Sequence, residues 1–213
     1  MAVYDLEEQE QLSEIKAWWE RYGRLVTTVA VAAALASVGW QAWQWHQRKQ
    51  SLEAAELYAT VQRAQGAKDA VKAREAAGQI IEKFGGSYYA DLAALLSAQV
   101  QLEAGDAKNA RAQLGWAAEK ANDPALRELA RLRLAAVLFD ENALDEALAQ
   151  LALQPSEAFR ARYADLKGDI LAAQGKNDEA RAAYQAAVAA LTEDESPLQN
   201  LITLKLEALG GAQ

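Results

Sequence analysis

The chain has 213 residues, a formal net charge of −8, one histidine and no cysteine. The lack of cysteine excludes disulfides, thiolate catalysis and thiolate zinc sites. An acidic balance without a basic patch argues against nucleic-acid binding. Because alanine is abundant and β-branched residues are sparse beyond residue 45, we predict an all-α domain there.

The first segment, residues 1–24, is an acidic tail. It holds six acidic and three basic side chains and includes the pair Trp18 and Trp19. A signal peptide begins with a short basic segment, so this composition argues against one. Cleavage stays an alternative, because residues 34–36 have the small-x-small pattern of a cleavage site.

Residues 25–45 contain no charged side chain and are followed by Arg48. As a helix they would be about 31 Å long, at roughly 1.5 Å per residue, which matches a bilayer core of about 30 Å. We therefore predict a single transmembrane helix, with a buried core helix as the alternative. Tryptophan favours the membrane–water interface, so these side chains are expected to contact lipid there: Trp18, Trp19, Trp40, Trp43 and Trp45.

The rest of the chain, residues 46–213, is predicted to be one helical-repeat domain. Helical sequence continues through residues 46–65 with no breaker before Gly66, and residues 85–87 form the clearest internal break. Basic residues are equally frequent before and after the apolar segment, so charge alone does not decide the orientation in the membrane.

Three stretches of this domain align, starting at residues 93, 128 and 163. Each reads as an apolar helix, a polar turn and a second helix that ends before a proline; Pro155 ends the middle copy. The turns are predicted at residues 105–106, 140–142 and 175–177. A degenerate earlier copy precedes them. The alanines after the turns, at a spacing near 34, are Ala76, Ala110, Ala147 and Ala180.

A period near 34 with paired helices resembles the tetratricopeptide repeat. The last copy alternates small and large residues at the positions where two antiparallel helices pack closely. Residues 197–209 read as one amphipathic helix that caps the stack. The packing residues of the last copy are Gly168, Leu171, Ala180, Tyr184 and Ala187.

Catalytic and cofactor motifs are not found. His46 stands alone, no His–Cys–carboxylate cluster suggests a metal, and no phosphate-binding loop occurs. We therefore expect no enzyme, no cofactor and no metal, but a protein-binding groove formed by stacked helix pairs. Core packing is an equal alternative for the apolar members of the groove-lining candidates, which are Leu129, Leu132, Phe139, Arg162, Asp165 and Asp169.

Residues spread over nearly the whole chain also carry a family resemblance. They include Tyr4, Glu8, Lys16, Trp18-Trp19 and Gly23 in the tail, Gly39-Trp40 and His46-Gln47 near the end of the span, and residues 132–138, 164–188 and 201–209 in the domain. In this order they resemble the YfgM family, the ancillary subunit of the bacterial SecYEG translocon. Residues 50–90 match that family poorly.

The resemblance implies a single-pass protein of the inner membrane, with its N-terminus in the cytoplasm and its repeat domain in the periplasm. It implies association with the SecYEG translocon and with the periplasmic chaperone PpiD, and a role in handing translocated polypeptides to chaperones. A regulatory adaptor that sequesters a signalling protein through the repeat groove is the alternative function.

Overall fold

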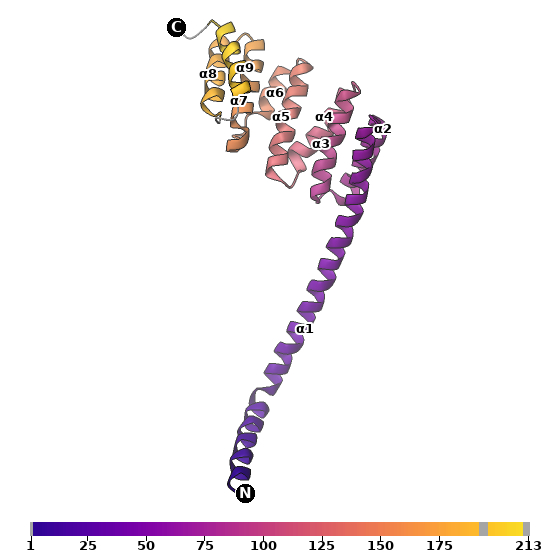
Figure 1. Ribbon diagram of the computed structural model, residues 1–213, viewed down its shortest axis with the longest axis vertical. Helices are drawn as coiled ribbons and strands as arrows, with labels where there is room; N and C mark the ends of the chain where they lie inside the picture. Colours follow the sequence, from indigo (N-terminus) through magenta and orange to yellow (C-terminus); the bar gives the residue numbers. More distant parts are fainter. Residues whose placement is uncertain (1, 192–195, 211–213) are drawn as a thin grey trace. The chain divides into compact units, whose positions relative to one another are not determined.

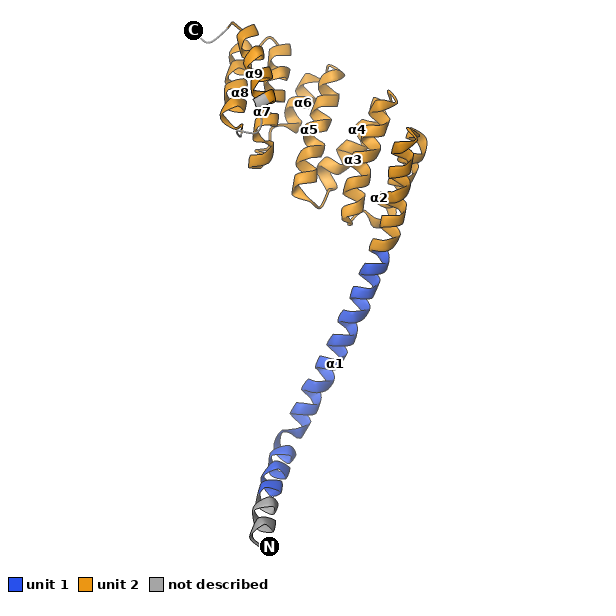
Figure 2. Cartoon of the chain, in the orientation of Figure 1, with its two compact units in different colours: residues 1–50 blue, residues 51–213 orange. Residues whose placement is uncertain are grey.

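The computed structural model describes the backbone of residues 2–191 and 196–210, and the side chains of residues 11–191 and 197–210. Within those ranges every regular element is an α-helix, so the predicted all-α class is confirmed. The chain divides into two compact units, residues 1–50 and 51–213 (Figure 2). The limits predicted for the tail, the span and the domain stay predictions, because a boundary between compact units does not mark a membrane surface.

Helix α1 (Ala2–Gly66) contains the apolar segment. Among the described helices it has the length and the apolar composition needed to cross a membrane. In its apolar segment, large aliphatic side chains are exposed, from 53% for Val31 to 69% for Leu35; they are Leu25, Val29, Val31, Leu35 and Val38. A core helix would bury these side chains, so the alternative of a buried core helix is wrong. The exposed apolar surface fits a helix anchored in lipid.

Unit 2 contains the end of α1 and the shorter helices (Figure 1). The helices form consecutive pairs: the end of α1 with α2, α3 with α4, α5 with α6, and α7 with α8, followed by α9. Their bounds are α2 Ala70–Phe84, α3 Tyr88–Glu103, α4 Ala107–Lys120, α5 Pro124–Asp140, α6 Leu144–Gln150, α7 Glu157–Ala173, α8 Asn177–Ala189 and α9 Ser196–Ala208.

The same turn joins the two helices of each pair. Lys68, Gly105, Asn142 and Gly175 all have a positive φ, between 55° and 77°. In each turn the next backbone N–H donates to the carbonyl five residues earlier, at 2.8–2.9 Å. This is the Schellman arrangement that closes helices at a left-handed residue. The turns predicted around residues 105, 142 and 175 are therefore confirmed, and Lys68 marks a fourth copy.

The fourth turn corrects the predicted register of the first copy. In the three clear copies the alanine stands five residues after the left-handed residue, as Ala110 does after Gly105. Five residues after Lys68 is Ala73. Ala73 is therefore the equivalent residue, and the assignment to Ala76 is wrong, although both are buried. The sequence did not indicate this turn, because a lysine stands where two of the other turns carry glycine.

The second helix of the third pair is shorter than predicted. Helix α6 ends at Gln150, instead of continuing to the residue before Pro155. The segment after it is held to α5, because Ser156 donates from its backbone N–H (3.1 Å) and its hydroxyl (2.5 Å) to the Glu128 carboxylate. Leu151 still reaches the core, so the short helix keeps the apolar contact that the repeat requires.

Helix α9 packs on the last pair, as predicted for a closing helix. Ile202 is fully buried in a cluster with Leu171 and Tyr184. Arg181 of α8 donates to the carbonyl of Leu209 at 2.7 Å. Gly210 follows with a φ of 97°, while Gly211 lies outside the described residues. The turn at Gly210 thus resembles those after α3, α5 and α7, and α9 corresponds to the first helix of a further repeat.

Candidate partner-binding face

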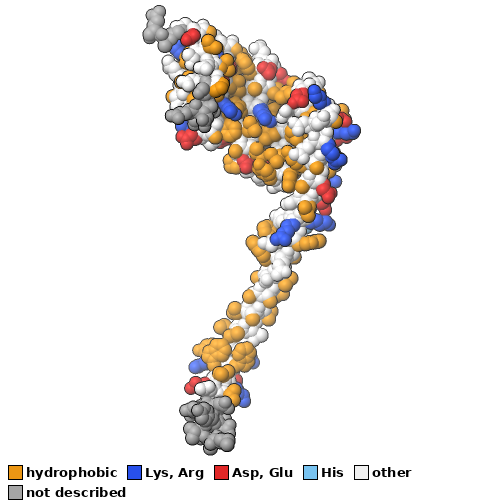
Figure 3. Space-filling view, viewed as in Figure 1, with side chains coloured by type: hydrophobic (Ala, Val, Ile, Leu, Met, Phe, Trp, Pro, Cys, Tyr) orange, Lys and Arg blue, Asp and Glu red, His pale blue; other side chains and the backbone are white. Residues whose placement is uncertain are grey.

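The first helices of neighbouring pairs, α3, α5, α7 and α9, can be compared position by position by counting back from their left-handed turn residues. Nine residues before the turn stand Leu96, Arg133, Leu166 and Leu201. Six residues before it stand Gln99, Ala136, Asp169 and Leu204. Figure 3 shows hydrophobic side chains gathered on the face of unit 2 that it displays, with scattered charges among them. The repeat is therefore uniform in backbone but variable in the chemistry of its surface.

A cleft opens between α3 and α5, with a volume of about 520 Å³. Its floor includes the buried side chains of Leu114 and Val137. Leu102, 39% exposed, stands on the α3 side. None of the residues that line this cleft is among the groove candidates predicted from the sequence; they are Ala98, Gln99, Leu102, Leu114, Arg133, Ala136, Val137 and Asp140.

The apolar groove candidates on α5 lie beside this cleft and do not line it. Leu129, Leu132 and Phe139 are half-buried and pack against the core cluster that contains Leu134 and Leu138. They therefore combine the two readings that the sequence left open, since part of each side chain packs in the core and part is exposed. A role in binding a partner stays a prediction.

The polar candidates on α7 differ from one another. Arg162 is exposed. Asp165 and Asp169 are both turned towards α9, where Lys205 Nζ lies 2.8 Å from a carboxylate oxygen of each. The side chains of Asp165, Asp169 and Lys205 are each at most 25% exposed. The two carboxylates therefore share one lysine partner within the domain. A role in partner binding stays a prediction for Arg162, Asp165 and Asp169.

Tyr184 of α8 completes this charged cluster, donating its hydroxyl hydrogen to Asp169 at 2.7 Å. Burial raises the pKa of Tyr184, and the nearby carboxylates of Asp169 and Asp165 raise it further. Burial also raises the pKa of Asp165, against the opposing effect of Lys205. Burial lowers the pKa of Lys205, but its bonds to both carboxylates outweigh this, and the net direction is upward. The cluster fastens α9 to α7 and α8.

Sequence reasoning could have found the role of Lys205 by aligning α9 with the other first helices. Five residues before the turn, those helices carry Val100, Val137 and Ile170, all buried. Lys205 stands at the same position. A lysine at a buried position requires a carboxylate partner, but only the packing of α9 identifies which one.

The predicted membrane-interface tryptophans are all exposed, between 51% and 66%. They stack with neighbouring aromatic rings: Trp18 with Tyr22 at 5.8 Å and Trp40 with Trp43 at 5.2 Å between centroids. Lys49 lies 5.8 Å from the centre of the Trp45 ring. Contact of these side chains with lipid stays a prediction.

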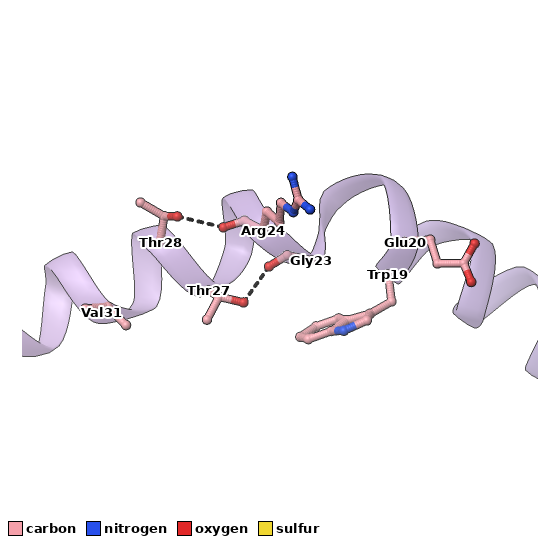
Figure 4. A pocket seen from close by; sticks show the side chains of 7 residues that line it. All are labelled: Trp19, Glu20, Gly23, Arg24, Thr27, Thr28 and Val31. Atoms are coloured by element: carbon pink, nitrogen blue, oxygen red, sulfur yellow. Dashed lines mark hydrogen bonds between the residues drawn. The ribbon is translucent and has the colours of Figure 1, made fainter.

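A surface notch lies at the start of the apolar segment, beside Trp19 and Gly23 (Figure 4). The Trp19 indole lies alongside Gly23, where an added Cβ would stand 3.1 Å from the ring. The Thr27 and Thr28 hydroxyls donate to the carbonyls four residues earlier, at 2.5 and 2.7 Å. These bonds satisfy both hydroxyls within the helix, which suits an apolar environment.

No group of three or more histidine, cysteine or carboxylate side chains that could hold a metal ion is found among the described residues. His46 lies 3.0 Å from the amide nitrogen of Gln50, between exposed side chains of one helix. The geometry of the described residues thus offers a repeat surface, with a cleft between α3 and α5, and an apolar helix.

Comparison with known families agrees with this architecture. A model of the family described as "Tetratricopeptide repeat-like domain" matches residues 16–211. The chain is therefore a tetratricopeptide-like repeat protein, as its paired helices and repeated turns indicate.

Individual relatives of similar length identify the family within this class of repeat proteins. Proteins named "Ancillary SecYEG translocon subunit" match from Haemophilus influenzae (32% identical, covering 87% of this chain and 90% of the relative), Aggregatibacter actinomycetemcomitans (33%, 97% and 100%) and Neisseria gonorrhoeae (29%, 96% and 98%). The chain belongs to this family, the YfgM family, so the expected resemblance is confirmed.

Proposed function

We propose that this protein is a membrane-anchored scaffold that associates with the SecYEG translocon. The observation that carries the proposal is the match of the chain, over almost its full length, to relatives named ancillary subunits of that channel. The match includes both the apolar helix and the repeat domain. A repeat stack supplies an extended binding surface, and an anchor would keep that surface at the membrane that contains the channel.

We further propose that the repeat domain lies in the periplasm and the N-terminus in the cytoplasm of a bacterial inner-membrane protein. In this position the domain would help pass translocated polypeptides from the channel to periplasmic chaperones, with PpiD as the expected partner. The role is binding and not catalysis, which is consistent with a repeat scaffold in which Lys205, Asp165 and Asp169 form an ion-pair cluster that fastens one helix to the next.

Topology is the first test. A reporter active only in the periplasm and a reporter active only in the cytoplasm are each fused to the C-terminus of the full-length chain. Activity of the periplasmic reporter, with the tail around Trp18 retained, supports the proposal. Activity of the cytoplasmic reporter overturns it and favours the regulatory adaptor, since no periplasmic chaperone could then reach the domain.

Co-purification is the second test. The tagged full-length protein is extracted in mild detergent, and channel subunits and PpiD are quantified in the eluate. Enrichment of both supports the proposed association. No enrichment of channel subunits over a control anchor that consists of residues 1–50 alone would contradict a role for the repeat domain at the channel.

A further inference from the structure

The cleft between α3 and α5 exists because of one small side chain. Six residues before the turn, α3 carries Gln99, α7 Asp169 and α9 Leu204, whereas α5 carries Ala136. The alanine side chain leaves open the space that a longer side chain would fill, and the buried Leu114 and Val137 become the floor. The result is an apolar hollow of about 520 Å³ on the surface of the stack.

Two charged side chains line this hollow at its two ends. Arg133 occupies the position where α3, α7 and α9 carry leucine. Asp140 lies seven residues later on the same helix, which is about 10.5 Å at 1.5 Å per residue. The ion pairs and hydrogen bonds found among the described side chains include neither Arg133 nor Asp140. An arginine without a carboxylate partner in an acidic protein is available to an external carboxylate.

The size of the hollow favours an extended ligand. A hollow of about 520 Å³ is small beside a helix, which is about 10–12 Å across with its side chains. A helix would therefore rest on the rim, while an extended chain could lower a single side chain to the floor. Side chains of an extended chain alternate between its two faces at about 3.3 Å per residue, so three alternate residues that face the cleft span about 13 Å. The long, flexible side chains of arginine and lysine can cover the difference from the roughly 10.5 Å between Arg133 and Asp140.

From this geometry we propose that the cleft binds an extended polypeptide segment with an acidic side chain at Arg133, an apolar side chain two residues further on over Ala136, and a basic side chain a further two residues on at Asp140. This inference rests on the proposed role of the repeat domain as a polypeptide-binding scaffold, and it names the site and the chemistry of the segment. The arginine selects for the carboxylate, and the hollow selects for the apolar side chain.

Peptide binding to the full-length protein in detergent micelles tests the assignment. The probe is a fluorescent ten-residue peptide with the central sequence Glu-Ser-Leu-Ser-Lys in a glycine–serine background, and fluorescence anisotropy gives its Kd. Arg133→Leu introduces the residue of the equivalent positions and should weaken binding about tenfold, the typical effect of losing one charge-assisted hydrogen bond. Ala136→Gln introduces the side chain that α3 carries and should weaken binding by filling the hollow.

The matched control is Arg160→Leu, which removes an exposed arginine of α7 outside the cleft. It should leave the Kd unchanged. Arg133→Glu should lose the original peptide and gain a peptide in which the glutamate is replaced by lysine, because Asp140 still selects the basic residue at the other position. Equal affinity of the wild type, Arg133→Leu and Ala136→Gln for the original peptide would overturn the assignment.

Co-purification with the channel, measured on the same variants, separates this inference from the proposed function. If the peptide affinities follow the expected pattern while no channel subunit co-purifies with the wild type, the cleft assignment stands and the translocon association fails. If the channel co-purifies and the peptide affinities do not depend on Arg133 and Ala136, the cleft assignment fails alone.

Discussion

Gly168 of α7 lies directly against the ring of Tyr184 of α8: a Cβ atom added to the glycine would stand 2.4 Å from Cε1 of the tyrosine. The helices of the last pair approach this closely because the glycine has no side chain and the tyrosine fills the space beside it. Both residues are buried, and they occupy the small and large packing positions expected from the repeat pattern.

Gly168→Ala is therefore expected to destabilise the protein by about 1–3 kcal/mol, because the added methyl group displaces the Tyr184 ring from a close-packed site. Urea denaturation followed by circular dichroism measures the free energy of unfolding. The matched control is Gly115→Ala in α4, where no heavy atom lies within 4 Å of the added Cβ. That change should stabilise the helix by up to about 1 kcal/mol. Equal effects of both changes would contradict the contact.

Asp91 provides a second prediction, because its fully buried carboxylate accepts the backbone N–H groups of Asn122 and Asp123 at 2.9 and 3.1 Å. Asp91→Ala leaves both donors without a partner and should cost about 1–3 kcal/mol for each. Asp91→Asn keeps an acceptor oxygen and should cost much less. Urea denaturation at neutral pH compares the two variants, and a larger loss for the asparagine variant would contradict the role of the acceptor.

The same side chain predicts a pH dependence. Burial raises the pKa of Asp91, although the two backbone donors lower it in part. Since the pKa in the folded state lies above the unfolded value of about 3.9, the contribution of this group to stability is full below pH 4 and is lost as the pH rises through the folded pKa. Asp91→Asn cannot titrate at this position. Its free energy of unfolding should therefore increase relative to that of the wild type as the pH rises from 4 to 7. A pH-independent difference would contradict the raised pKa.

The Lys205 cluster predicts how α9 is held. Lys205→Met removes the cation between Asp165 and Asp169 and should destabilise the docking of α9 by roughly 1–3 kcal/mol, a value reduced for the partial exposure of the groups. Hydrogen exchange of the α9 amides measures this locally. Combining Lys205→Met with Asp165→Asn and Asp169→Asn should restore protection. Lys167→Met, an exposed lysine of α7, is the control that should leave α9 unchanged.

The apolar part of α1 makes a prediction about membrane insertion. Leu35 lies at the centre of residues 25–45, where an arginine costs about 2.5–3.5 kcal/mol in apparent insertion free energy. Leu35→Arg should therefore reduce the fraction of protein that remains with alkaline-washed membranes. Leu52→Arg, which changes an exposed leucine beyond the apolar segment, should not. If neither change lowers the fraction of protein that remains with the washed membranes, residues 25–45 do not span the membrane.

Patterns within a short stretch of sequence were sufficient for the helical class, the apolar helix, three of the turns and the packing positions of the last pair. The physical reason is that each depends on neighbouring residues. Helix periodicity places the apolar face, glycine or asparagine permits the left-handed turn at Gly105, Asn142 and Gly175, and small residues define where paired helices approach.

The packing of one helix on the next decided the remaining features. Lys68 adopts a left-handed conformation without the glycine that would have indicated it, so the register of the first copy followed only from the turn geometry. The pairing of Lys205 with Asp165 joins residues 40 positions apart. The cleft at Ala136 depends on α3 and α5 lying side by side, and an alanine in an alanine-rich helix has no local signature. Such contacts form between separate segments, and their geometry is a property of the folded stack.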